Sequence, residues 1–283
     1  MTWTTLIAAD ELGVAIDRCV VIDCRHDLLN PKAGIDAYAQ GHIPGARFLS
    51  QDTDLAGPKT GRNGRHPLPD REALAARLRA CGLNAGQQLV AYDAHGGMYA
   101  ARLWWLARWL GHGPVAVLDG GLDAWRRERL PVVVEVPGPG AGNFKAGEPL
   151  VASVQAADIE AALGSTRRLV IDARAGERYR GEVEPMDPVA GHIPGALNRP
   201  FAQNLRPDGR FKPGPVLRGE FDALLGGRDP ASVIHQCGSG VTACHNLLAM
   251  TTAGYADTAL YPGSWSEWCS EPTRPVARGA DPS

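Results

Sequence analysis

The sequence predicts an α/β protein with two tandem domains, each a mainly parallel sheet flanked by helices. Its 283 residues exceed the usual size of a single domain. Several motifs occur twice along the chain. Within each copy, short β-rich apolar runs alternate with segments of helical period, which is the pattern of parallel strands joined by helices. Length, repetition and alternation thus indicate the same architecture.

Two motifs carry the repeat. VVIDCR (20–25) returns as LVIDAR (169–174), and GHIPGA (41–46) returns unchanged at 191–196. Their separation of about 150 residues is too long for a solenoid, whose units span ~20–50 residues. The repeat therefore indicates a duplicated domain.

The repeat also sets the expected domain boundaries. We predict a first domain at 1–136, a linker rich in proline and glycine at 137–150, and a second domain at 151–283. The first copy is longer by about seven residues between GHIPGA and its next strand. We expect these extra residues in the Gly- and Pro-rich stretch 57–69.

The elements of the second copy follow from the same patterns. Strands are expected at 168–172, 232–236 and 257–260. Helices are expected at 154–163, 218–225, 241–253 and 264–269. Ligands of parallel sheets bind beyond the carboxyl ends of the strands. Cys237 directly follows one of these strands, so we place it at that edge.

The overall composition excludes some classes of partner. Lys and Arg number 29 and Asp and Glu 31, so the net charge is −2 and no bulk positive charge favours nucleic acid. No apolar run approaches the ~20 residues of a membrane span, and we recognise no signal peptide. None of the six cysteines has zinc-site spacing, so no metal is expected. This cysteine usage favours a reducing compartment, the cytoplasm.

Cys237 lies in VIHQCGSGVTACHNLL (233–248), between an expected strand and an expected helix. The N–H groups of such a turn and the N-terminus of the next helix stabilise an anion. Lowering a cysteine pKa from ~8.5 to ~6.5 requires ~2.7 kcal/mol, of which the helix end supplies up to ~2. Gly238 and Gly240 allow the close backbone approach. We therefore predict a reactive thiolate rather than an inert buried thiol.

Two other cysteine chemistries fit less well. A cysteine phosphatase needs an arginine six positions after its nucleophile, and Ala243 stands there. A cysteine protease needs a histidine base beside the sulfur. His235 falls within the strand and His245 well inside the helix, so neither is aimed at Cys237.

CGSGVTA, the two GHIPGA motifs, DARAGERYRGEVEP and GSWSEW resemble the two-domain rhodanese family of sulfurtransferases over essentially the whole chain. The resemblance implies two rhodanese-like domains, the first catalytically silent, with Ala94 where the nucleophile would stand. It implies that Cys237 carries sulfur as a persulfide from a small-molecule donor to a thiophilic acceptor. Cyanide, thiols and thioredoxin are the expected acceptors, and no metal or organic cofactor is required.

The loop sequence is closest to the family's 3-mercaptopyruvate branch, whose members carry CGSGVTA where thiosulfate enzymes carry CRKGVTA. The resemblance assigns Ser239 a catalytic role, and a hydroxyl there suits an enolate leaving group. It implies substrate contacts from the loop and from the GERYR segment: Gly238, Gly240, Val241, Thr242, Arg178 and Arg180. The branch's second arginine after EP is missing, and Asp187 stands near that place.

The resemblance also implies supporting residues around the nucleophile. His66 in RHPLP matches a catalytic histidine, with Asp52 as its expected acidic partner and Asp54 as the alternative. Asp172 and Arg174 are expected to brace the active loop.

Two alternatives to a 3-mercaptopyruvate enzyme stay open. One is a thiosulfate sulfurtransferase. The other is a non-catalytic relay module that receives sulfur from a partner protein.

Overall fold

The computed structural model describes residues 2–138 and 140–281. Residue 139 of the predicted linker and the terminal residues 1, 282 and 283 of the predicted domains lie outside the described residues. The chain forms two compact units. The first comprises Met1–Gly57, Leu68–Leu150 and Leu205–Phe211, and the second comprises Pro58–Pro67, Val151–Asn204 and Lys212–Ser283. Most of the stretch in which we expected the extra residues thus belongs to the second unit.

The first unit is built on a five-stranded parallel sheet of order β1-β5-β4-β2-β3. Its strands are β1 (Leu6–Ile7), β2 (Cys19–Asp23), β3 (Arg47–Phe48), β4 (Gln88–Tyr92) and β5 (Val115–Leu118). Its α-helices are α1 (Ala9–Ala15), α2 (Ala33–Gln40), α3 (Arg71–Ala80), α4 (Ala100–Trp109) and α5 (Gly121–Arg127), and a 3₁₀ turn spans Ile16–Arg18.

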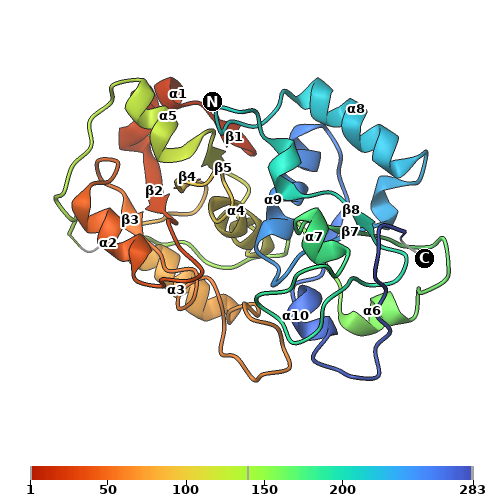
Figure 1. The fold of residues 1–283 in the computed structure, drawn as a ribbon. Coiled ribbons are helices and arrows are strands. Elements are labelled where there is room, and N and C mark those ends of the chain that lie inside the picture. Colours follow the sequence, from red (N-terminus) through yellow and green to blue (C-terminus); the bar gives the residue numbers. More distant parts are fainter. Residues whose placement is uncertain (1, 139, 282–283) are drawn as a thin grey trace. The chain divides into compact units, whose positions relative to one another are not determined.

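The second unit repeats this arrangement in the order β6-β10-β9-β7-β8, again all parallel. Its strands are β6 (Ala152–Ser153), β7 (Leu169–Asp172), β8 (Leu197–Asn198), β9 (Val233–Gln236) and β10 (Ala259–Leu260). Its α-helices are α6 (Ala156–Glu160), α7 (Gly176–Tyr179), α8 (Gly214–Leu225), α9 (Thr242–Thr252) and α10 (Ser264–Trp268), and 3₁₀ turns span Phe201–Asn204 and Pro230–Ser232. Figure 1 labels β7 and β8 of this sheet and the helices α6 to α10 of this unit.

The predicted α/β fold with two parallel-sheet domains is confirmed. The two-residue strands β6 and β8 were not predicted, because so short a segment carries no periodicity. Helix α8 begins four residues before the predicted start at 218. Pro215 lies in its first turn, where the missing N–H is not needed.

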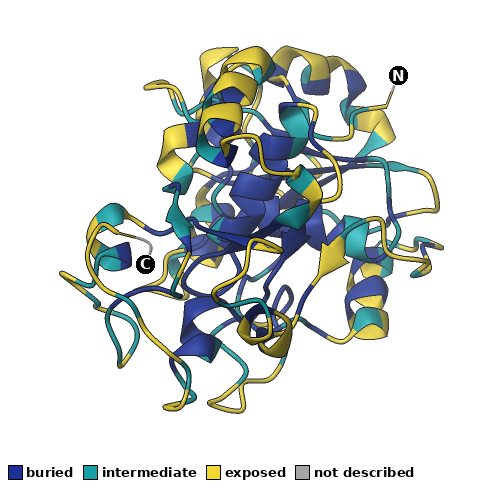
Figure 2. Ribbon diagram, turned by 90° about the vertical axis from the view of Figure 1, so that its right-hand side faces the viewer, coloured by how far each residue is buried: buried dark blue, intermediate teal, exposed yellow. Residues whose placement is uncertain are grey.

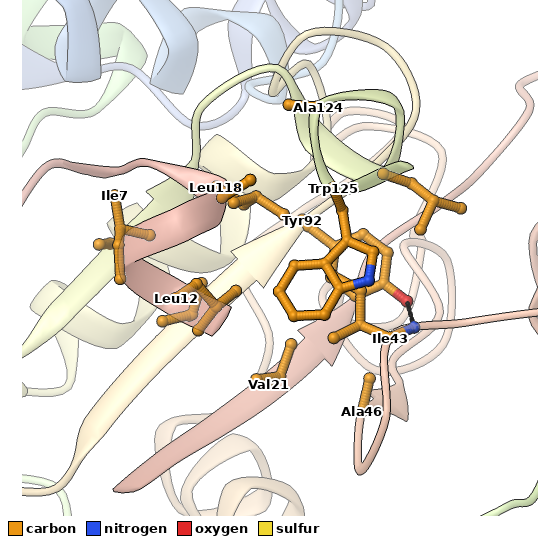
Figure 3. Close-up of a cluster of buried hydrophobic side chains, with 13 residues drawn as sticks. Ile7, Leu12, Val21, Ile43, Ala46, Tyr92, Leu118, Ala124 and Trp125 are labelled. Carbon is orange, nitrogen blue, oxygen red and sulfur yellow. Dashed lines mark hydrogen bonds between the residues drawn. The ribbon is translucent and has the colours of Figure 1, made fainter. Parts of the chain in front are cut away.

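Each sheet buries one face against a matching set of helices. In the first unit, Leu12 of α1 and Trp125 of α5 join Val21 and Tyr92 of the sheet in one apolar cluster (Figure 3). In the second unit, Trp265 and Trp268 of α10 belong to the corresponding cluster on β7, β9 and β10. The central strands are almost entirely buried, and helices such as α3 and α8 are exposed on their outward faces (Figure 2). This burial places the strand ends, and hence the loops that follow them, on rigid supports.

Strand β9 contains a buried histidine, His235, which contacts α9. Its Nε2 lies 3.1 Å from Sδ of Met250, and burial lowers the pKa of His235 to about 3. The folded protein therefore keeps His235 neutral, whereas the unfolded chain takes up a proton below an ordinary pKa of ~6.5. Protonation of His235 in the unfolded chain therefore lowers the free energy of unfolding as the pH falls from about 6.5 towards 3. The decrease is up to ~1.4 kcal/mol per pH unit.

We expect His235→Leu to flatten the pH dependence of unfolding. Relative to the parent protein, its free energy of unfolding should fall by about 2 kcal/mol less between about pH 6.5 and pH 4.5. Urea denaturation followed by circular dichroism at each pH measures this difference. His95→Leu, at an exposed histidine, is the matched control. Parallel pH profiles for His235→Leu and the parent would contradict the prediction.

Candidate active site

Cys237 stands at the carboxyl end of β9, the middle strand of the second sheet. The loop after it is fixed by the start of α10. The Cys237 N–H donates to Ser264 Oγ (3.1 Å), and the Cys237 carbonyl accepts from the Trp265 N–H (3.0 Å). The Gly238 carbonyl accepts from the Ser266 N–H (2.9 Å). The GSWSEW motif therefore positions the cysteine loop through two main-chain hydrogen bonds and one to the Ser264 side chain.

The sulfur of Cys237 faces back into its own loop. The Gly240 N–H donates to Sγ at 3.2 Å, and helix α9, eleven residues long, begins at Thr242 directly after Val241. Gly240 has a φ of +78°, and a Cβ there would lie 2.3 Å from the Pro262 carbonyl oxygen. Glycine is thus required at 240 by both conformation and space. The sulfur therefore lies next to a loop N–H and just before the start of a helix.

Ser239 and His66 meet beside this loop. His66 Nδ1 lies 2.7 Å from Ser239 Oγ, and both side chains are buried. His66 comes from the segment 58–67 that belongs to the second unit. The segment is held against α10, because the Arg65 N–H donates to Ser266 Oγ at 3.0 Å. The structure therefore brings together two of the predicted catalytic residues from positions 173 apart in sequence.

Arg178 lies beside the residue that follows the nucleophile. A Cβ built on Gly238 would be 3.5 Å from Arg178 Nη1. Arg178 Nη2 pairs with Glu184 Oε1 at 2.6 Å and with Asp187 Oδ2 at 3.5 Å. These carboxylates orient the guanidinium next to the loop, at a place where it can contact a bound anion.

Arg180 is placed differently from Arg178. Its guanidinium pairs with Glu182 at 2.7 Å, and the two side chains are 38% and 55% exposed. This ion pair accounts for the charge of Arg180, and a substrate contact of this residue stays a prediction.

Asp172 and Arg174 form a buried ion pair at 2.6 Å beneath the loop. The Arg174 guanidinium also lies 4.7 Å from the ring centre of Trp265, which bonds the Cys237 carbonyl. Burial opposes the charge on Arg174, but Asp172, Glu184 and Cys237 together raise the pKa of its guanidinium. A permanent cation is therefore held close to the cysteine loop.

Asp52, the expected partner of His66, lies in the first unit. Its Oδ2 is 3.8 Å from Nε2 of His26. The alternative, Asp54, accepts from the Ser50 N–H (2.8 Å) and pairs with Arg77 (2.6 Å). The pairing of Asp52 with His66 stays a prediction.

The corresponding loop of the first unit already holds an anion of its own. Ala94 occupies the position of the nucleophile, and Asp93 precedes it. The Asp93 carboxylate accepts hydrogen bonds of 2.8–2.9 Å from the N–H groups of His95, Gly97, Tyr99 and Ala100. The turn of the first unit thus binds the Asp93 carboxylate through four N–H groups, whereas in the second unit the Gly240 N–H donates to the Cys237 sulfur.

Sequence reasoning missed several residues of this site. Ser264 and Ser266 lie in the GSWSEW motif, but their hydrogen bonds depend on how α10 packs against the cysteine loop. Arg65 directly precedes His66, and its Nη2 would lie 2.8 Å from a Cβ on Gly238. Its position next to the predicted catalytic His66 could have indicated that Arg65 belongs to the site.

Across 2–138 and 140–281, no group of three or more His, Cys, Asp or Glu side chains is arranged to hold a metal ion. Within the same ranges, no helix has the length and apolar character needed to cross a membrane. The six cysteines are free thiols.

Comparison with known proteins agrees with the fold and the motifs. The family description "Rhodanese-like domain" matches residues 8–128 and 155–271. A Pseudomonas aeruginosa protein named "Probable 3-mercaptopyruvate sulfurtransferase" is 46% identical over 283 residues, covering 99% of this chain and 100% of that protein. "Putative thiosulfate sulfurtransferase SseB" of Mycobacterium tuberculosis is 40% identical, covering 97% of each chain.

The solved structures include a similar chain. The crystal structure of SseA from Escherichia coli, described among 3-mercaptopyruvate sulfotransferases of "Rhodanese" fold, matches with a TM-score of 0.79 and 33% identity. The match covers 93% of this chain and 99% of that one. The chain therefore belongs to the rhodanese family, as its motifs predicted.

Proposed function

We propose that this protein takes the thiol sulfur of 3-mercaptopyruvate onto Cys237, where it becomes the sulfane sulfur of a persulfide, and passes it to a thiophilic acceptor. The chain is an enzyme of the sulfurtransferase class, in keeping with relatives that span its full length. The observation that carries the proposal is the loop itself. A cysteine sulfur accepts an N–H at the start of a helix, and a Ser–His pair lies within the same loop region.

The reaction needs no net oxidation. The Cys237 thiolate attacks the sulfur of 3-mercaptopyruvate, and a new S–S bond forms as the C–S bond breaks. The bonding electrons move to the organic fragment and leave the enolate of pyruvate. Protonation of the enolate gives pyruvate, and Cys237 carries the persulfide. Cyanide then attacks the outer sulfur, which releases thiocyanate and restores the thiolate.

The Ser239–His66 pair is suited to the enolate. Ser239 is one residue from the loop glycine that bonds the sulfur, and its hydroxyl is 2.7 Å from His66 Nδ1. A hydroxyl donor beside the donor's carbonyl oxygen stabilises the negative charge that develops there. The histidine supplies a proton path to that oxygen. Arg178 pairs with the donor's carboxylate through its guanidinium fork.

Thiosulfate is the second candidate donor. It is favoured by the 40% identical M. tuberculosis relative, which is named a thiosulfate sulfurtransferase. It is also favoured by the arginines beside Gly238, because thiosulfate is a dianion. A sulfur relay fed by a partner protein is the remaining alternative.

A donor comparison tests the proposal. The purified protein is mixed with cyanide and either 3-mercaptopyruvate or thiosulfate, and thiocyanate is measured. We expect kcat/KM for 3-mercaptopyruvate to exceed that for thiosulfate by at least about tenfold, a difference of ~1.4 kcal/mol in transition-state binding. Equal or faster turnover of thiosulfate would overturn the donor. Turnover of neither would favour the relay.

The acceptor and the compartment are also proposals. Thiols and thioredoxin are proposed as acceptors, since each presents a nucleophilic sulfur to the persulfide. A cytoplasmic location is in keeping with six free thiols.

A further inference from the structure

A second arginine lies against the cysteine loop, in addition to Arg178. A Cβ built on Gly238 would lie 2.8 Å from Arg65 Nη2 and 3.5 Å from Arg178 Nη1. Two guanidinium groups therefore face the same residue, next to Cys237. The glycine leaves open the space that a side chain would fill.

One carboxylate connects the two arginines. Asp187 Oδ1 pairs with Arg65 Nη1, and Asp187 Oδ2 lies 3.5 Å from Arg178 Nη2. The Asp187 side chain is only 4% exposed, whereas that of Arg65 is 23% exposed. Asp187 stands near the position at which relatives of the 3-mercaptopyruvate branch have a second substrate-binding arginine. In the structure, it instead anchors an arginine from a different segment.

The backbone of Arg65 is fixed by a hydrogen bond, and its side chain still has an N–H group that can donate to a ligand. Its N–H donates to Ser266 Oγ, and Gly64 before it has a φ of +83°. A Cβ on Gly64 would lie 2.7 Å from the Gly263 carbonyl oxygen, so this segment packs tightly on the start of α10. Among the described residues, Arg65 Nε is buried and has no hydrogen-bond partner. A buried guanidinium N–H needs an acceptor, and a ligand carboxylate can supply one.

We propose that Arg65 binds the carboxylate of the sulfur donor together with Arg178, and that Asp187 positions the two guanidinium groups for it. This inference rests on the proposed function, in which the donor is an α-keto acid bearing a thiol. Two forked cations can hold one carboxylate while its thiol reaches Cys237. The residue pair Arg65 and Asp187 thereby takes the place of the branch's second arginine.

The test pairs a change in the protein with a change in the donor. Arg65→Gln is assayed with 3-mercaptopyruvate and with mercaptoacetone, in which a methyl group replaces the carboxylate. We expect kcat/KM for 3-mercaptopyruvate to fall by about 10- to 100-fold, mainly through KM, and that for mercaptoacetone by less than about threefold. Arg65→Lys should recover part of the loss, because it restores the charge without the fork. Arg62→Gln, an exposed arginine in the same segment, is the matched control.

A binding measurement separates this inference from the proposed function. In a Cys237→Ser background, 3-mercaptopyruvate binds without being consumed, and titration calorimetry gives its Kd. We expect Arg65→Gln to raise that Kd by about 10- to 100-fold. Equal losses with both donors, or an unchanged Kd, would overturn the role of Arg65. Tight, Arg65-dependent binding without thiocyanate formation would instead contradict the proposed function and leave the binding role standing.

Discussion

Cys237→Ser is expected to lower sulfur transfer by more than about 1,000-fold while the protein stays folded. A serine hydroxyl is not ionised at neutral pH and cannot hold a sulfane sulfur as a persulfide. The Cys237 N–H and carbonyl hydrogen bonds to Ser264 and Trp265 involve the main chain, so the loop should keep its form. Thiocyanate formation measures activity, and the circular dichroism melting curve measures folding.

Mass spectrometry gives a second measurement of the same prediction. After donor treatment without an acceptor, the Cys237 peptide of the parent protein should gain the mass of one sulfur atom, and the same peptide of the Cys237→Ser variant should gain none. Cys19→Ser, at a half-buried thiol in the first unit, is the control that should keep full activity. Retained transfer by Cys237→Ser would move the chemistry to another residue.

Ser239→Ala is expected to lower kcat for 3-mercaptopyruvate by about 100- to 1,000-fold with little change in KM. In the proposed mechanism, the Ser239 hydroxyl, which lies 2.7 Å from His66 Nδ1, stabilises charge that develops only as the C–S bond breaks. Its loss should therefore weaken transition-state binding more than substrate binding. Rapid-mixing measurements of pyruvate release, in a single turnover, follow this step directly.

The second half-reaction supplies the control for Ser239→Ala. Transfer from the persulfide to cyanide forms no enolate, so the variant should discharge its sulfur at close to the parental rate. His66→Ala should slow the first step by a similar factor, and the double variant should be little slower than either single one, because the two residues act as a unit. Equal slowing of both half-reactions would contradict a specific role in enolate stabilisation.

Much of the fold was predictable because it depends on local patterns. The β-rich run before Cys237 became β9, and the apolar helical period after it became α9. The duplicated motifs predicted two parallel sheets, and each unit contains one. Short elements such as β6 and α7 were not predictable, since two to four residues carry no period and are formed by tertiary contacts.

The place of Cys237 in the fold was predictable for the same local reason, and its role as nucleophile stays a prediction. A cysteine between a strand, a glycine turn and a helix is positioned by its own neighbours in sequence. The expected close backbone approach is present at Gly240, where φ is positive, whereas the atoms nearest to a Cβ on Gly238 belong to the side chains of Arg65 and Arg178. The ion pair of Arg180 with Glu182 was not predictable, since it depends on side-chain placement, and a substrate contact of Arg180 stays a prediction.

The sequence by itself determined the duplication, the strand–loop–helix turn around Cys237 and the alanine, Ala94, at the matching position of the first copy. Only the tertiary structure decided that Arg65 and His66 join the second unit, that Ser264 and Ser266 hold the loop, and that Asp187 ties Arg65 to Arg178. The physical reason is the separation along the chain of the residues that interact. Backbone conformation follows from a few adjacent residues, whereas ion pairs and side-chain hydrogen bonds depend on which distant segments the folded chain brings within about 3 Å of each other.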